Sequence, residues 1–148
     1  MVIIRIFFIT FAFVLVSGCT TITVLQVNNA SEIKHVCIQD GQQICSDGRM
    51  LGVIREGFDR HGIATQVYTG NLPSQCEYNL SYMCERSWDF ATYLKHAEMR
   101  LYKGITQIGY VEYDCGVYSL MKWQSTRTKM DPFIDELLSG RPIQKRGE

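Results

Sequence analysis

The chain has 148 residues, 46% of them hydrophobic, and its 15 lysines and arginines balance its 15 aspartates and glutamates. This balance excludes the broad basic surface that nucleic-acid-binding proteins use, so we expect no nucleic-acid partner. The only basic run, in residues 141–148, is short and contains a proline and a glycine, which indicates a flexible tail. The length remaining after the first 18 residues suits one compact domain.

The first 18 residues have the order of an export signal. Arg5 precedes an apolar run from Ile6 to Val16, and the small residues Ser17 and Gly18 follow. The run is well short of the roughly 20 apolar residues that a membrane-spanning helix needs. It therefore predicts a signal peptide over residues 1–18, with an uncleaved short anchor and an ordinary cleaved signal as the alternatives.

The residue after this signal, Cys19, distinguishes these alternatives. Val16-Ser17-Gly18-Cys19 resembles the lipobox of bacterial lipoproteins. The resemblance implies cleavage between Gly18 and Cys19, diacylglycerol on the Cys19 sulfur and an acyl chain, such as palmitate, on its new amine. Two or more acyl chains anchor a protein stably, since each buried methylene contributes about 0.8 kcal/mol. Thr20 differs from the aspartate that retains such proteins in the inner membrane, so we expect the periplasmic face of the outer membrane.

Residues 19–32 join this anchor to the domain. They are rich in Thr and Asn with scattered Val and Leu, which suits a tether, although an opening strand is the alternative. We expect a single periplasmic domain over residues 33–140.

One helix and one strand are expected at the start of this domain. Residues 33–39 predict a strand that ends at Asp40-Gly41. A helix capped by Ser46 or Asp47 follows, with apolar residues at helical spacing. Gly62 then ends it as a left-handed residue, which would bring Ile63 against Phe58 in a Schellman motif.

A series of strands is expected next. Residues 63–68 alternate apolar and polar side chains, and residues 76–84 place Cys76, Tyr78, Leu80, Tyr82 and Cys84 on one face. Residues 93–102 and 105–115 predict a hairpin around Lys103-Gly104.

The last expected element is a helix with an apolar stripe at Met130, Ile134, Leu137 and Leu138. It begins either at Asp131-Pro132 or near Ser125. The element order predicts an α+β two-layer sandwich, with a mostly antiparallel sheet of four or five strands and two helices on one face.

Five cysteines remain once Cys19 carries lipid, so at most two disulfides form and one thiol is left over. Cys76 and Cys84 cannot pair within one extended strand, because eight residues span about 26 Å and bridged Cα atoms lie about 5.5 Å apart. The other pairings stay open.

A set of short motifs is spread over residues 33–138: Val36-Cys37-Ile38, Gly57-Phe58, His61-Gly62-Ile63, Cys76, Ser87-Trp88-Asp89, Lys122-Trp123, Ser125-Thr126, Pro132 and Asp135-Glu136-Leu137-Leu138. In these motifs the mature chain resembles a family of small uncharacterised gammaproteobacterial lipoproteins. The resemblance implies no activity. It implies that Cys37 and Cys76 belong to the shared pattern and form a disulfide, and it implies no pairing for Cys45, Cys84 or Cys115.

The sequence offers no pattern for metal or catalytic chemistry. The cysteine spacings are wider than those of zinc sites, and His35 and His61 suit structural roles, the latter at a helix C-terminus. Cys115 has no activating base near it in sequence. Phosphate-loop, zinc-protease and nucleophile-elbow motifs are absent. We therefore expect no enzyme, no metal site and no cofactor.

The aromatic residues have two interpretations. They form a recognition surface for an envelope protein or a glycan, or they pack the sheet beneath the helices. Asp89 is also expected to cap a helical turn over residues 90–93. The aromatic residues concerned are Tyr78, Tyr82, Tyr110 and Tyr113 in expected strands, and Trp88 and Trp123 in expected connecting segments.

These observations favour a non-enzymatic outer-membrane lipoprotein whose domain binds or scaffolds an envelope component. The alternative is a periplasmic inhibitor of a cell-wall hydrolase, which rests on analogy with other small disulfide-bearing lipoproteins.

Overall fold

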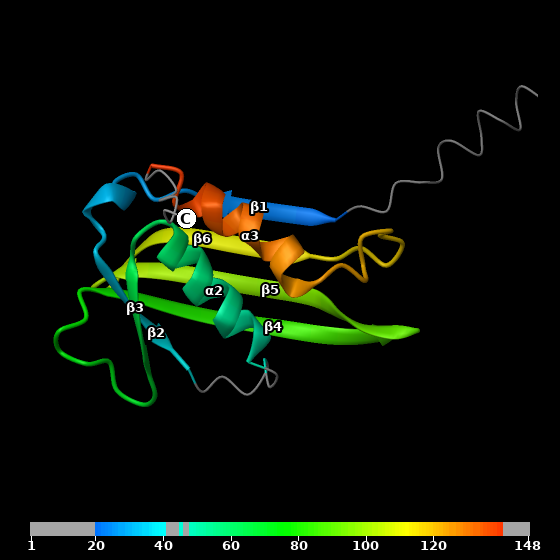
Figure 1. Ribbon diagram of the computed structural model, residues 1–148, viewed down its shortest axis with the longest axis horizontal. Helices are drawn as coiled ribbons and strands as arrows, with labels where there is room; N and C mark the ends of the chain where they lie inside the picture. Colours follow the sequence, from blue (N-terminus) through cyan, green and yellow to red (C-terminus); the bar gives the residue numbers. More distant parts are fainter. Residues whose placement is uncertain (1–19, 41–44, 46–47, 141–148) are drawn as a thin grey trace, which may run out of the picture.

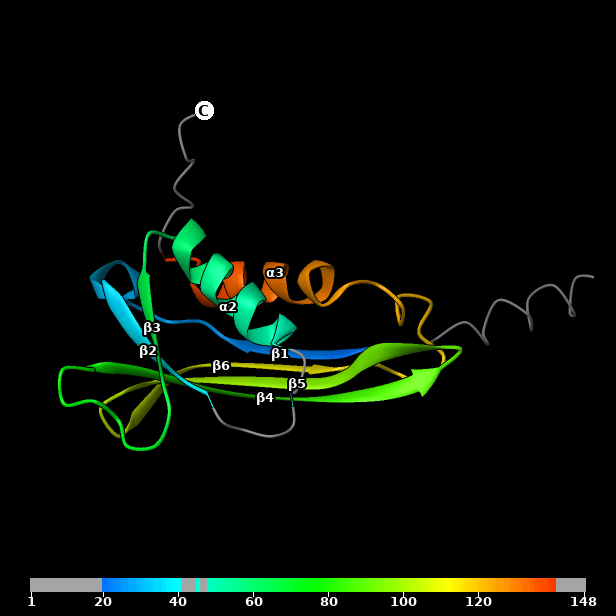
Figure 2. The same cartoon turned by 60° about the horizontal axis from the view of Figure 1, so that its bottom comes forward.

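A six-stranded sheet with two helices on one face forms the domain in a computed structural model, which describes residues 20–40, 45 and 48–140 (Figures 1 and 2). The signal segment, Cys19 and the tail from residue 141 lie outside the described residues. The elements are β1 (Thr21–Leu25), the 3-10 helix η1 (Ala30–Glu32), β2 (His35–Gln39), α2 (Arg49–Arg60), β3 (Ala64–Tyr68), β4 (Tyr78–Asp89), β5 (Ala91–Lys103), β6 (Thr106–Asp114) and α3 (Thr126–Leu137).

The sheet is mixed, in the order β1-β6-β5-β4-β2-β3. Its first four strands are antiparallel, whereas β2 runs parallel to both β4 and β3. The α+β class with two helices is therefore confirmed, but the sheet has six strands instead of four or five. The additional strand is β1. Residues 19–32 were expected to form a tether or an opening strand, and Thr21–Leu25 form the strand. Their run of β-branched residues favours this conformation.

The first helix ends as its sequence predicts. Gly62 has a φ of 66°, the Ile63 N–H donates to the Phe58 carbonyl at 3.0 Å, and the Gly62 N–H donates to the Asp59 carbonyl at 2.8 Å. These two bonds are the Schellman pair. The helix begins after Gly48, with no side-chain cap bond there, and the expected caps Ser46 and Asp47 lie outside the described residues.

The second helix takes the earlier of its two expected starts. The Ser125 hydroxyl accepts a hydrogen bond from the Thr128 N–H at 3.1 Å, which caps the helix and leaves Pro132 inside it. The apolar stripe is buried as expected, since Met130, Ile134 and Leu137 are fully enclosed.

The core lies between the helices and the sheet. The helices approach closely because Gly57 of α2 has no side chain: a Cβ there would lie 2.7 Å from Ile134 Cγ2. Large residues that are fully buried fill the space below, among them Phe58, Ile54, Ile38, Leu80, Met99 and Leu101.

One expected turn is wrong. Asp89 is the last residue of β4 and caps no helical turn, because Phe90 alone separates it from Ala91, with which it pairs. Phe90 has a φ of 58° and forms the tip of the long β4–β5 hairpin. Trp88, expected in a connecting segment, thus lies within a strand.

Two disulfides fasten β2 and its surroundings to β4. Cys37 is bonded to Cys76, with Cα atoms 5.8 Å apart, which is the pairing that the family resemblance implies. A second bridge joins Cys45 to Cys84, with Cα atoms 5.3 Å apart. Cys115 is the remaining cysteine of the described residues and is buried.

The two bridges lie on opposite faces of the sheet. Cys84 belongs to the main core under the helices, whereas Cys37 and Cys76 form a small buried cluster with Tyr68 on the other face. Cys76 was expected on the face of Tyr78. It instead precedes β4 and turns to the opposite face, because the regular alternation starts only at Tyr78.

Candidate functional site on the uncovered sheet face

One face of the sheet is covered by the helices and the other is not (Figure 2). The uncovered face carries a row of charged residues on the neighbouring strands β5 and β6. Glu98 of β5 lies directly opposite Glu112 of β6, and His96 lies directly opposite Asp114. Two carboxylates in opposed cross-strand positions destabilise a sheet unless nearby cations compensate. The uncovered face is therefore organised by the need to neutralise Glu98 and Glu112.

Cations from β5 supply that compensation. One Arg100 Nη donates to Glu98 Oε2 at 2.7 Å, and His96 Nε2 lies 3.3 Å from Glu98 Oε1. The other imidazole nitrogen, Nδ1, lies 3.0 Å from Asp114 Oδ1. The Arg100 guanidinium also covers the Tyr110 ring, 5.6 Å from its centroid. We call His96, Glu98, Arg100, Glu112 and Asp114 the charged row.

The surroundings of His96 favour its protonated form. Burial lowers the pKa of His96, but the hydrogen bonds and negative charges of Asp114 and Glu98 together outweigh this effect and raise the pKa above its ordinary value. The imidazolium then donates to a carboxylate from each nitrogen.

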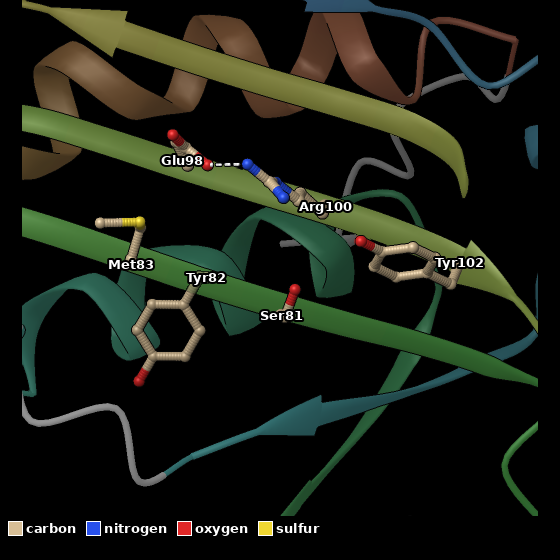
Figure 3. A pocket seen from close by; sticks show the side chains of 6 residues that line it. All are labelled: Ser81, Tyr82, Met83, Glu98, Arg100 and Tyr102. Carbon is tan, nitrogen blue, oxygen red and sulfur yellow. Dashed lines mark hydrogen bonds and ion pairs between the residues drawn. The ribbon is translucent and has the colours of Figure 1, made fainter. Parts of the chain in front are cut away.

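A small pocket lies beside the charged row (Figure 3). Its volume is about 160 Å³, and Ser81, Met83, Glu98, Arg100 and Tyr102 line it from β4 and β5. Figure 3 shows Glu98 and Arg100 joined along β5, whereas the Tyr82 ring projects away from them. Its hydroxyl donates to Asp40 at 3.2 Å, and burial raises the pKa of Tyr82 to about 12.

Three residues of this region have the geometry of a partial metal site. His96, Glu98 and Glu112 each offer one ligand atom, all within 4.8 Å of one another. In the structure, both His96 nitrogens and Glu98 already have partners within the charged row. Alternation along β5 places His96 and Glu98 on one face, so their proximity is visible in the sequence, although no site was expected there. Glu112 joins them through strand register alone.

A second polar group, the Lys129 ammonium, is buried between α3 and β5. Lys129 is 5% exposed, and its Nζ donates to the carbonyls of Lys122 at 2.7 Å and Leu94 at 3.2 Å. Burial lowers the pKa of Lys129, against the opposing effect of Cys115. The Cys115 thiol points to the Gly116 carbonyl at 3.9 Å. These contacts hold the segment after β6 in place and give Cys115 a buried setting.

The two histidines considered from the sequence have structural positions. His61 is buried and its Nε2 lies 3.0 Å from Asp135 Oδ1, so it links the end of α2 to α3. Arg60 reinforces this link with an ion pair to Asp135 at 2.9 Å and another to Asp131 at 3.2 Å. His35 begins β2 on the face of Cys37.

The aromatic residues divide between the two interpretations. Tyr78, Tyr82 and Tyr113 are buried and pack the core, as the packing interpretation requires. The two tryptophans are different, since Trp88 and Trp123 are 73% and 51% exposed.

No protein-family model and no curated protein matches the sequence. The solved structures that share the fold include two PelC dodecamers from Paraburkholderia phytofirmans. A variant PelC has a TM-score of 0.54 and 10% identity, over 82% of this chain and 96% of that chain. The other PelC has a TM-score of 0.52 and 11% identity, over 86% of this chain and all of that chain, 100%. Within the described ranges, no helix is long and apolar enough to span a membrane.

Proposed function

We propose that this protein is an outer-membrane lipoprotein, anchored through Cys19 on the periplasmic face, and that its domain is a non-enzymatic scaffold whose copies associate through the edges of the sheet. The observation that carries the scaffold is the chemistry of the two edge strands. Neither β1 (TITVL) nor β3 (ATQVY) contains a charged residue or a proline. Natural edge strands usually carry such residues, because they prevent pairing with another chain.

Pairing between these edges is a head-to-tail contact. If β1 of one copy pairs with β3 of the next, each subunit uses two different surfaces, and such contacts generate a closed ring when the rotation between subunits permits. The solved PelC structures that share this fold are dodecamers. They are a precedent for this fold in a large assembly. Because their identity to this chain is low, the proposal depends on the edge strands of this chain itself.

The character of the uncovered face supports the non-enzymatic part. Four of the five residues of the charged row are paired, His96 with Asp114 and Glu98, and Arg100 with Glu98, and the pocket beside them holds about 160 Å³. This pocket is smaller than the roughly 300 Å³ or more that binding sites for small molecules usually have, although hollows of about 350 to 430 Å³ lie elsewhere on the described surface. The inhibitor alternative would be favoured by a loop with projecting polar side chains. Residues 117–123 project mainly apolar ones, whereas the loop between β3 and β4 exposes Thr69, Asn71, Ser74 and Gln75, so the inhibitor stays the alternative.

The anchor is tested by metabolic labelling. Labelled palmitate should enter the wild-type protein and be absent from Cys19→Ala, because the thiol and the new amine of Cys19 carry the acyl groups. Incorporation into the variant would refute the anchor. Envelope fractionation should recover the wild type with outer-membrane markers, and recovery with the inner membrane would refute the use of Thr20 as a sorting residue.

The association is tested by placing a lysine in each edge strand. Thr23→Lys in β1 and Gln66→Lys in β3 add charge at exposed edge positions, so the oligomers of the detergent-solubilised protein should dissociate in native mass spectrometry. Gln107→Lys, at an exposed position of the inner strand β6, is the matched control and should keep the oligomer. A monomeric wild type, or oligomers that survive both edge lysines, would exclude edge association.

A further inference from the structure

The loop between β6 and α3 buries polar side chains and exposes apolar ones. Ser119 and Lys122 are 6% and 5% exposed, whereas Tyr118 and Leu120, on either side of Ser119, are 84% and 83% exposed. A soluble loop normally shows the opposite pattern, with its polar residues in water and its apolar ones covered. The loop therefore presents a surface suited to an apolar surrounding.

Specific polar contacts hold this conformation. The Lys122 ammonium donates to Asp89 Oδ2 at 2.6 Å and to the Val117 carbonyl at 2.6 Å. The Ser119 hydroxyl accepts from the Met121 N–H at 3.3 Å. Because the Ser119 and Lys122 side chains occupy the buried positions of the loop, its apolar side chains point outward.

The tip of the β4–β5 hairpin extends the same surface. Asp89, which binds Lys122, also accepts a hydrogen bond at its carbonyl from Trp123 Nε1 at 2.8 Å. Its neighbours Trp88 and Phe90 are 73% and 88% exposed. Loop and hairpin tip thus form one surface, which we call the apolar end: Trp88, Phe90, Val117, Tyr118, Leu120 and Met121.

The chain enters the domain at the apolar end. The Thr20 hydroxyl donates to the Ser119 hydroxyl at 3.2 Å, and β1 begins at the next residue. Figures 1 and 2 both show the start of β1, the hairpin tip and the loop at the same end of the molecule. An apolar pocket of about 210 Å³, lined by Ile22, Met121 and Phe133, lies between Thr20 and α3.

This position leaves almost no tether. Consecutive Cα atoms are about 3.8 Å apart, so a lipid on residue 19 is attached beside Thr20 and Ser119. A tether was expected over residues 19–32. From Thr20 onwards these residues instead contact the domain, and Thr21–Leu25 form its strand β1.

We propose that the apolar end docks on the phospholipid bilayer, so that the domain is held to the membrane by its own surface as well as by lipid. The inference rests on the proposed anchoring at Cys19. Tyrosine and tryptophan are the residues that favour the membrane–water interface, because one part of each side chain is apolar and another forms hydrogen bonds. A second protein copy is the less favoured occupant, since the point of lipid attachment adjoins this surface and the unprotected sheet edges run along the sides of the sheet.

Tryptophan fluorescence provides a direct test, because the chain contains only two tryptophans, Trp88 and Trp123, and both lie at this end. The full lipidated protein is reconstituted into vesicles of phosphatidylethanolamine and phosphatidylglycerol, with or without bromine on the acyl chains. We expect brominated lipid to quench the emission, and we expect iodide to quench it several-fold less than in the detergent-free domain made with Cys19→Ser. Trp88→Phe and Trp123→Phe assign the signal to each residue.

Matched variants separate the apolar end from general hydrophobicity. Phe90→Ser and Leu120→Ser together should reduce quenching by brominated lipid. Ile105→Ser should not, although Ile105 is 99% exposed, because it lies in the β5–β6 turn at the opposite end of the sheet (Figure 1).

The possible failures are distinguishable. If the protein does not float with the vesicles, the anchor itself is refuted. If it floats but brominated lipid leaves the emission unchanged, docking is overturned while the anchor stands. Shielding from iodide without quenching by brominated lipid would mean that protein covers the apolar end, which also overturns docking on the bilayer.

Discussion

The contact between the two helices can be tested at Gly57, where a single methyl group is added. A Cβ at this position would lie 2.7 Å from Ile134 Cγ2 and 3.1 Å from Ile134 Cδ1. Ile134 is fully buried and β-branched, so its side chain has little freedom to move away. Overpacking of this kind costs about 1–3 kcal/mol, and replacing glycine by alanine within a helix returns about 1 kcal/mol. We therefore expect Gly57→Ala to lower the free energy of unfolding by up to about 2 kcal/mol.

The same helix provides the control. A Cβ on Gly52 has no neighbour within 4 Å, so Gly52→Ala should raise the free energy of unfolding by up to about 1 kcal/mol. The assay is urea unfolding followed by circular dichroism, with the disulfides intact and one detergent for all variants. In an Ile134→Ala background the clash is gone, and Gly57→Ala should become stabilising as well. If Gly57→Ala stabilises the otherwise unchanged protein as Gly52→Ala does, the proposed close contact between α2 and α3 is refuted.

Two further predictions concern the cysteines and the charged row. Peptide mapping without reduction should recover both disulfides as linked peptide pairs and Cys115 as a free thiol. The Cys115 thiol should be alkylated slowly in the folded protein because it is buried. Finding Cys115 in a bridge would contradict the pairing. NMR titration should give His96 a pKa above the ordinary value of about 6.5, since Asp114 and Glu98 stabilise its charged form more than burial opposes it. The stabilisation by His96 should then be complete below about pH 6.5 and be lost as the pH rises through the folded pKa, and His96→Gln should remove this dependence; a folded pKa below the ordinary value would contradict it.

Local patterns in the sequence determine much of this fold. The Schellman ending at Gly62 depends on residues within one turn, and the buried faces of β4 and α3 follow from periods of 2.0 and 3.6 residues. The proposed export and lipid attachment likewise depend on the contiguous segment that ends at Cys19. These signals are readable because the residues that interact are close in sequence.

The second disulfide depends on strand order. Pairing Cys45 with Cys84 requires β2 to lie beside β4, which does not follow it in the chain. Both bridges span 39 positions, as expected where the two joined segments run in parallel. The equal spacing is visible in the sequence, but it indicates these two pairings only once β2 and β4 are known to be parallel neighbours.

Tertiary structure also decided the charged row and the apolar end. Glu98 meets Glu112 through the register of two strands, and one shift along either strand would separate them. The loop at the apolar end exposes Tyr118 and Leu120 because Lys122 is drawn inward to Asp89, a partner 33 positions away. Hydrophobicity along the chain predicts burial for such a loop, and only the long-range polar contacts reverse that prediction.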